Sequence, residues 1–161
     1  MTGKPIVIYT DGSSRGNPGP GGYGALLIYG NHRKEISKGY RLTTNNRMEL
    51  LGIIEALKLI TSTDHPIEIF SDSKYVVNAI NKGWLSKWLR TGFAGGKKNR
   101  DLWIDYSTIA SKFNKLSVTW VKGHASNPFN NRCDELATAA ADGQNLAVDA
   151  GYESDPNSLF K

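Results

Sequence analysis

The chain has a single cysteine, Cys133, and it lacks any long hydrophobic run. One cysteine excludes an internal disulfide and a zinc cluster built on several cysteines, and it suits a reducing compartment. The apolar run near the N-terminus is too short for a signal peptide, and no segment is long enough to cross a bilayer. We therefore expect a soluble, cytoplasmic protein with no membrane association.

Acidic residues are outnumbered by basic ones, 15 against 20, which gives a formal net charge of +5 and an isoelectric point of about 9.3. This excess is compatible with a polyanionic partner, and a solvated basic surface is the alternative explanation. The length of 161 residues suits one domain. Because the hydrophobic pattern ends at Gly143, we expect one domain over residues 1–142 and a weakly ordered tail over residues 143–161.

A continuous apolar run at residues 6–9 leads into Asp11 and then into a stretch rich in glycine and proline. Such a run, bounded by turn residues, predicts a strand buried on both faces. Residues 24–29 and 35–42 predict two further strands, and the short polar link between them favours an antiparallel meander.

A helix follows the meander, with Asn45 or Asn46 as its cap, and residues 66–71 form the next predicted strand. The helical connection makes this fourth strand parallel to its neighbour, which we expect to be the first strand. With a fifth strand at residues 116–121, the pattern predicts an α/β fold with a mixed sheet flanked by helices. Asp11 and Asp72 would then lie at the same end of the sheet, where open α/β sheets bind ligands.

Two more acids begin helices, Glu49 on the face that carries the apolar residues and Asp134 in the last predicted helix. Taken singly, Glu49 or Asp134 could compensate a helix dipole, and Asp72 could cap the helix that follows it. None of these readings explains why four acids, including Asp11, converge on one edge of the sheet.

Clustered carboxylates repel one another, by ~4 kcal/mol for a pair 4 Å apart at an effective dielectric constant near 20. A cation must compensate this repulsion. Because the candidate ligands are all oxygen atoms, with neither cysteine nor paired histidines, a hard ion such as Mg²⁺ or Mn²⁺ is favoured over zinc.

Four blocks of sequence, TDGSSRGNPGPGGYG, TTNNRMEL, SDSKYV and VKGHASNPFNNRCDELA, closely resemble the bacterial type 1 ribonuclease H family. The resemblance extends from about Lys4 to Ala141. It implies a ribonuclease H-like fold with five strands in a mixed sheet, and an Mg²⁺-dependent endonuclease that hydrolyses the RNA strand of an RNA:DNA hybrid to give 5′-phosphate products. Removal of replication primers is the cellular duty that it suggests. Nothing in the sequence demands an oligomer, so we expect a monomer.

The resemblance also implies roles for individual residues. Asp11 would bridge two ions, Glu49 and Asp72 would hold one ion, and Asp134 the other, while His124 would move a proton or help product leave. The positions that match the family's substrate contacts are Asn17, Thr44, Asn45, Asn46, Trp84, Lys87, Trp88 and Trp103.

Some of these substrate assignments have structural alternatives. Asn45 or Asn46 could cap a helix, and Trp84 and Trp88 could anchor a small helix, whereas Trp103 is offset from the apolar stripe of its helix and is the better candidate for contact. The basic protrusion, defined as residues 84–100, is shorter than is usual in the family. Two other functions stay open, a catalytically silent hybrid-binding module and a nuclease of this fold that acts on another nucleic acid.

Overall fold

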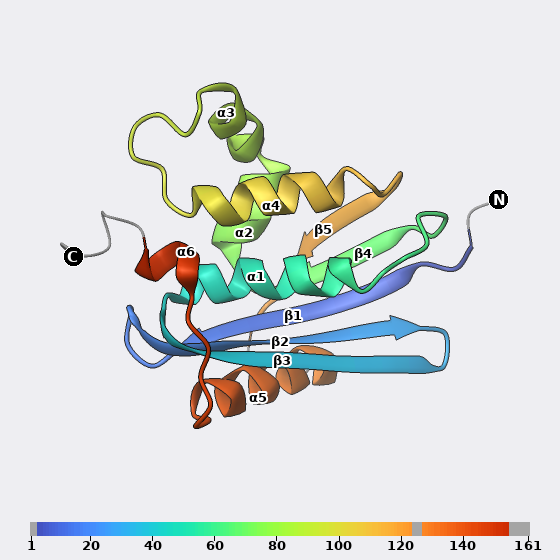
Figure 1. The fold of residues 1–161 in the computed structure, drawn as a ribbon. Helices are drawn as coiled ribbons and strands as arrows, with labels where there is room; N and C mark the ends of the chain where they lie inside the picture. The colour runs from blue at the N-terminus through green and yellow to red at the C-terminus, as the bar shows by residue number, and fades with distance from the viewer. Residues whose placement is uncertain (1–2, 124–126, 155–161) are drawn as a thin grey trace.

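The computed structural model describes residues 3–123 and 127–154, which form a five-stranded mixed sheet flanked by helices (Figure 1). The elements are β1 (Ile6–Ser14), β2 (Gly19–Tyr29), β3 (His32–Thr43), α1 (Asn45–Lys58), β4 (Ile67–Ser71), α2 (Lys74–Asn81), α3 (Trp84–Arg90), α4 (Arg100–Ala110), β5 (Leu116–Trp120), α5 (Pro128–Ala141) and α6 (Ala150–Glu153). The predicted fold class is confirmed.

Strand β1 lies at the centre of the sheet, whose order is β3, β2, β1, β4, β5. The first three strands form an antiparallel meander and β4 runs parallel to β1, both as the chain pattern predicted, and β5 runs parallel to β4. Thr10 of β1 pairs with Ser71 of β4. The residues that follow this pair, Asp11 and Asp72, therefore lie next to each other where the pairing of β1 with β4 ends.

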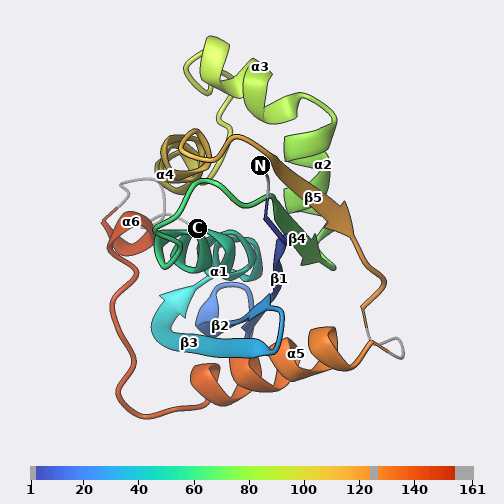
Figure 2. The same cartoon turned by 90° about the vertical axis from the view of Figure 1, so that its right-hand side faces the viewer.

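Helices cover both faces of the sheet. Figures 1 and 2 show α1 on one face, with α2 and α4 beyond it, and α5 on the opposite face. Close packing of α5 depends on glycine in β2, because a Cβ on Gly24 would lie 2.5 Å from the carbonyl oxygen of Cys133. Among the described helices, none combines the length and the apolar character that a bilayer span requires.

Two local predictions differ from the structure. Strand β2 begins at Gly19, so part of the glycine-rich stretch is strand and not turn. The cap of α1 is Thr44, whose hydroxyl accepts a hydrogen bond from the Arg47 N–H at 3.3 Å, and not Asn45 or Asn46. Thr44 takes this role because it has extended backbone torsions, whereas the two asparagines already belong to the helix.

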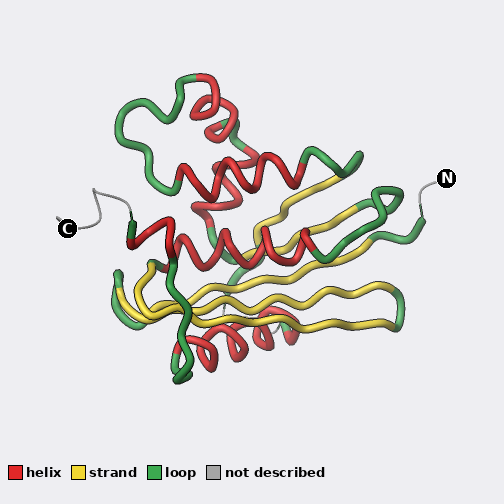
Figure 3. Tube along the Cα trace, viewed as in Figure 1, coloured by secondary structure: helices red, strands yellow, loops and turns green. Residues whose placement is uncertain are grey.

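The segment after Gly143, for which we expected weak order, makes specific contacts with the rest of the protein as far as Ser154. Backbone hydrogen bonds join Ala147 to Gly39 and Arg41 of β3, each at 2.9 Å, and the short helix α6 buries Tyr152. In Figure 3 this segment runs as a loop from α5 past β3 to α6. Sequence periodicity missed it because the segment is held by a few specific contacts and not by a repeating apolar face.

Candidate active site

The site is built first from the ends of two parallel strands. Asp11 belongs to β1 and Asp72 follows β4, one residue beyond the paired Thr10 and Ser71. Asp11 is 6% exposed, so its carboxylate is largely removed from water. A buried carboxylate needs a compensating partner, because desolvation of an isolated charge is costly.

Helix α1 brings a third acid to this edge. A Cβ on Gly12 would collide with the backbone nitrogen of Glu49, so glycine allows the first turn of α1 to approach β1. Glu49 is 4% exposed, and its Oε1 atom has no hydrogen-bond partner within the described part of the chain. A buried acceptor of this kind is costly unless a ligand satisfies it.

The four predicted acids converge, although not equally closely. One carboxylate oxygen from each of Asp11, Glu49 and Asp72 lies within 4.8 Å of the other two. Asp134, from α5, lines the same cleft of about 540 Å³ and raises the pKa of Asp11 by its charge and a hydrogen bond. His124, the fifth predicted catalytic residue, lies outside the described residues.

The electrostatics of this acid cluster favour protonation or a bound cation. Burial, together with the charges of Asp72 and Asp134, raises the pKa of Asp11 to about 8. Burial likewise raises the pKa of Glu49 well above its ordinary value, with Asp11 and Asp72 adding to the effect. Oxygen donors from several elements and one unsatisfied buried oxygen fit a hard divalent ion.

Trp120 contacts this cluster, and sequence reasoning did not select it. In the parallel register of β5 against β4 it pairs with Ser71, and its indole N–H donates to the main-chain oxygen of Asp72 at 3.2 Å. The ammonium of Lys74 lies 5.1 Å from the Trp120 ring centroid. The sequence did contain a signal for Trp120: it ends a strand that runs parallel to the strand leading to Asp72.

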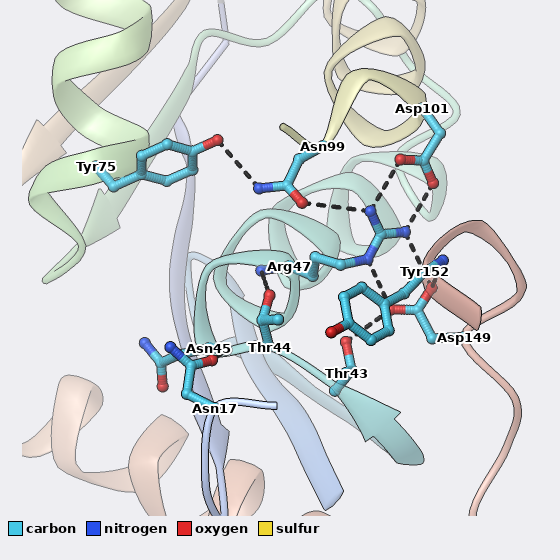
Figure 4. A network of polar contacts seen from close by, with 10 residues as sticks. All are labelled: Asn17, Thr43, Thr44, Asn45, Arg47, Tyr75, Asn99, Asp101, Asp149 and Tyr152. Atoms are coloured by element: carbon cyan, nitrogen blue, oxygen red, sulfur yellow. Dashed lines mark hydrogen bonds and ion pairs between the residues drawn. The ribbon is translucent and has the colours of Figure 1, made fainter. Parts of the chain in front are cut away.

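Several predicted substrate residues lie at the mouth of the cleft. Asn45 and Asn46 line it and are exposed, and the side-chain oxygen of Asn17 accepts a hydrogen bond from the Asn45 N–H at 3.0 Å. Thr44 lies between this pair and Arg47 as the helix cap (Figure 4). The loop between β1 and β2 is thereby joined to the start of α1 beside the acids.

The three tryptophans predicted to contact substrate differ in their exposure, and not in the way we expected. Trp103 is fully buried and donates its indole N–H to the Tyr75 hydroxyl at 2.9 Å, so the prediction that it contacts substrate is wrong. The apolar stripe of α4 did not reveal this burial, because the helix packs on more than one side. The ring of Trp88, from α3, meets the Trp103 ring edge-on at a centroid distance of 5.9 Å. Trp84 is 40% exposed, and Lys87 is exposed on the same helix.

Arg47 is a second residue that sequence reasoning missed. It is 3% exposed, and its guanidinium donates two hydrogen bonds to Asp149 at 2.8 and 2.9 Å and two to Asp101 at 2.9 and 2.7 Å. Asp149 also accepts from the Thr43 hydroxyl at 2.6 Å. Figure 4 shows these residues converging from β3, α1, α4 and the segment before α6. No periodic pattern signals this contact, because its partners are far apart in sequence.

Comparison with known proteins gives a consistent result. The family model described as RNase H matches residues 3–142. A ribonuclease H of Syntrophus aciditrophicus is 48% identical over 153 residues, covering 92% of this chain and 87% of that protein. A ribonuclease H of Desulforamulus reducens is 49% identical over 150 residues, covering 91% and 93%.

Solved structures resemble the whole fold. LC9-RNase H1, a type 1 RNase H with the type 2 active-site motif, aligns with a TM-score of 0.80 at 29% identity and covers 99% of this chain and 85% of that one. LC11-RNase H1, solved in complex with an RNA/DNA hybrid, aligns with a TM-score of 0.65 at 28% identity, covering 85% and 96%.

Proposed function

The chain belongs to the ribonuclease H family, and on that premise we propose that it is an endonuclease that hydrolyses the RNA strand of RNA:DNA hybrids with divalent metal ions. The observation that carries the proposal is the convergence of Asp11, Glu49 and Asp72 within 4.8 Å, with a buried Glu49 oxygen that no described group satisfies. A hybrid is the nucleic acid named in the LC11-RNase H1 complex.

Asp11, Glu49, Asp72 and Asp134 would hold the metal, and Mg²⁺, with Mn²⁺ as a substitute, suits their oxygen donors. Bound divalent ions supply activation of a water for in-line attack and stabilisation of the leaving oxygen. The protein's own part is to hold its carboxylates at fixed positions: Asp11 and Asp72 follow a pair of hydrogen-bonded residues on two parallel strands, and the first turn of α1 brings Glu49 close to β1. His124 would move a proton or assist product release.

Recognition of the hybrid would be divided between two surfaces. At the mouth of the cleft, Asn17, Asn45 and Asn46, with Thr44, offer groups that can hydrogen-bond a 2′-hydroxyl or a minor-groove base edge, which distinguishes RNA from DNA. On the basic protrusion, the cations available for the phosphates of the DNA strand are Lys87, Arg90, Lys97, Lys98 and Arg100.

We assign Trp84 to contact with the DNA strand, because it is the most exposed indole of the protrusion. Trp88 is half-buried against the core, so its part is to support that surface. Because the four acids and the mouth of the cleft come from one chain, we propose that a monomer is active. The single cysteine suits a reducing compartment, so we propose the cytoplasm as its location. Its duty would be to remove RNA primers and transcription-linked hybrids.

A cleavage panel tests this function. Equal amounts of labelled RNA:DNA hybrid, double-stranded RNA and double-stranded DNA are incubated with the protein in Mg²⁺, in EDTA, and in EDTA followed by excess Mg²⁺. We expect internal cuts in the RNA strand of the hybrid alone, loss of cutting in EDTA, and recovery on adding Mg²⁺. Cleavage that survives chelation, or equal cutting of the other duplexes, would refute the proposal.

A further inference from the structure

The contacts of Arg47 continue beyond its two carboxylates toward the cleft. Its Nη1 atom lies 3.4 Å from the side-chain oxygen of Asn99, the cap residue of α4. The Asn99 amide donates to the Tyr75 hydroxyl at 3.1 Å, and Tyr75 lines the cleft of the acid cluster. A continuous polar path, drawn in Figure 4, therefore joins α1, the start of α4 and the first turn of α2.

This path passes through Asn99, where the basic protrusion returns to the body of the protein. The protrusion leaves α2 at Gly83, whose φ is +79°, and returns at Asn99, whose φ is +65°. Asp101, in the first turn of α4, is therefore the first carboxylate after the protrusion, and its partner Arg47 lies two residues from Glu49 on α1.

The bond between Arg47 and Asp101 is suited to fix a distance. A bidentate pair between a guanidinium and a carboxylate is directional, and Arg47 is buried, so its side chain is already ordered. In the pair of Arg41 with Glu153 the guanidinium is itself 59% exposed, and a solvated guanidinium constrains its elements less than the buried Arg47 does, although Asp101 is 43% exposed.

We propose that Arg47 is a positioning residue that, through Asp101, sets the basic protrusion at a fixed place relative to the acid cluster. One hybrid then engages both surfaces at once. The inference rests on the proposed function, because it takes the hybrid as the ligand of both surfaces. The bond of Arg47 with Asp149 has a different task, which is to hold the segment before α6.

The two carboxylates of Arg47 provide a matched pair of variants. Asp101→Asn and Asp149→Asn each remove one negative charge and one bidentate acceptor from the same guanidinium, but only Asp101 belongs to α4. Each charge change alone would tighten binding to a polyanion. Weaker binding by Asp101→Asn would therefore oppose the charge effect.

The experiment measures dissociation constants by fluorescence anisotropy in EDTA, below the melting temperature of every variant. One labelled hybrid is long enough to span the cleft and the protrusion, and a second is short enough to fill the cleft alone. For Asp101→Asn we expect the long hybrid to bind about fivefold more weakly. The slope of its log binding constant against log salt concentration should be smaller in magnitude by about 1. The dissociation constant of the short hybrid should change by no more than twofold.

Asp149→Asn should leave both dissociation constants within twofold of the wild type while lowering the melting temperature. In Mg²⁺, Asp101→Asn should raise KM for the long hybrid with kcat within twofold. Asn99→Gly removes the side chain, and glycine tolerates the left-handed backbone at this position. This variant should also bind the long hybrid more weakly, and it replaces Asp101→Asn in the test if Asp101→Asn does not fold.

Unchanged affinity of Asp101→Asn for the long hybrid, equal losses for both hybrids, or equal losses in the two carboxylate variants would overturn the inference. The positioning role and the proposed function can be tested separately. A wild-type protein that binds the long hybrid in EDTA but does not cut it in Mg²⁺ would contradict the function while leaving the positioning comparison readable.

Discussion

Helix α1 carries two buried charged residues, Arg47 and Glu49, whose surroundings are opposite in character. Arg47 is balanced, because two carboxylates accept hydrogen bonds from its guanidinium. Glu49 lies among other carboxylates, and its Oε1 atom has no donor in the described part of the protein. Within two positions the same helix thus contributes to a satisfied ionic cluster and to an unsatisfied one.

The difference separates structure from function. A satisfied cluster needs no ligand, and removing one of its partners leaves an uncompensated buried charge, whereas a set of like charges destabilises the protein unless protons or a cation neutralise it. The two clusters also respond to pH in opposite directions. Although burial opposes ionisation, the Arg47 guanidinium lowers the pKa of Asp101, so the stability from that pair is lost as pH falls. The pKa of Asp11 is raised, so its contribution to stability is lost as pH rises.

The largest expected effect is on catalysis by the unsatisfied cluster. Asp11→Asn removes a carboxylate that the metal would need, so the cleavage rate on hybrid in Mg²⁺ should fall by about 10⁴-fold, equal to roughly 5 kcal/mol in the activation barrier. Gel assays under single-turnover conditions measure the rate, and anisotropy should show that hybrid binding in EDTA persists. Activity near that of the wild type would remove Asp11 from the metal site.

The next effect is on stability and concerns the satisfied cluster. Arg47→Met leaves Asp149 buried without its cation and should reduce the free energy of unfolding by ~3–5 kcal/mol, measured by urea denaturation. Arg41→Met is the matched control, because the Arg41 side chain is 59% exposed in its pair with Glu153, and we expect a loss below ~1 kcal/mol. Equal losses of unfolding free energy in the two variants would show that the buried ion pairs of Arg47 contribute no more to stability than the exposed pair of Arg41.

A third effect gives the sign of the pH dependence. The folded-state pKa of Asp11 is raised from 3.8 to about 8, so its contribution to stability is fully present below pH 3.8 and is lost as pH rises through 8. In EDTA, the free energy of unfolding should therefore fall by about 1 kcal/mol between pH 7 and pH 9. Saturating Mg²⁺ should offset this fall, because the ion binds the deprotonated form.

In Asp11→Asn the same interval should show a smaller fall, and Mg²⁺ should stabilise the variant less than the wild type. Urea denaturation at each pH, with EDTA or Mg²⁺, provides the measurement. A wild-type stability that rises from pH 7 to pH 9 in EDTA would contradict the assignment of a raised pKa to the acid cluster.

The two clusters also differ in how far the sequence predicts them. Asp11 and Asp72 could be placed together because buried runs and a helical crossover determine which strand ends are adjacent, and strand ends follow from local patterns. Arg47 gave no such signal, since its partners Asp101 and Asp149 lie 54 and 102 residues away. Contacts between single side chains on irregular segments depend on tertiary packing that periodicity does not record.

The same reasoning explains why the sequence did not predict the burial of Trp103 or the contacts of the segment after Gly143. A helical stripe identifies one buried face, but α4 has two, because α1 lies on one side and the Trp88 ring meets Trp103 on another. The segment that leads to α6 has little periodicity of its own, yet it is held by main-chain bonds to β3 and by the buried side chain of Asp149.

The smallest expected effect concerns Trp120, which supports the unsatisfied cluster from outside. Trp120→Phe keeps an aromatic ring but removes the N–H that donates to the main-chain oxygen of Asp72, a contribution of about 1 kcal/mol and hence roughly fivefold. If this bond positions Asp72, the cleavage rate should fall by about that factor at subsaturating Mg²⁺ and recover at high Mg²⁺. Tyr29→Phe, which removes an aromatic hydroxyl at an exposed position on the strand end far from Asp72, controls for the loss of a polar group. A rate that falls equally at all Mg²⁺ concentrations would instead mean that Trp120 acts on substrate and not on the metal ligand.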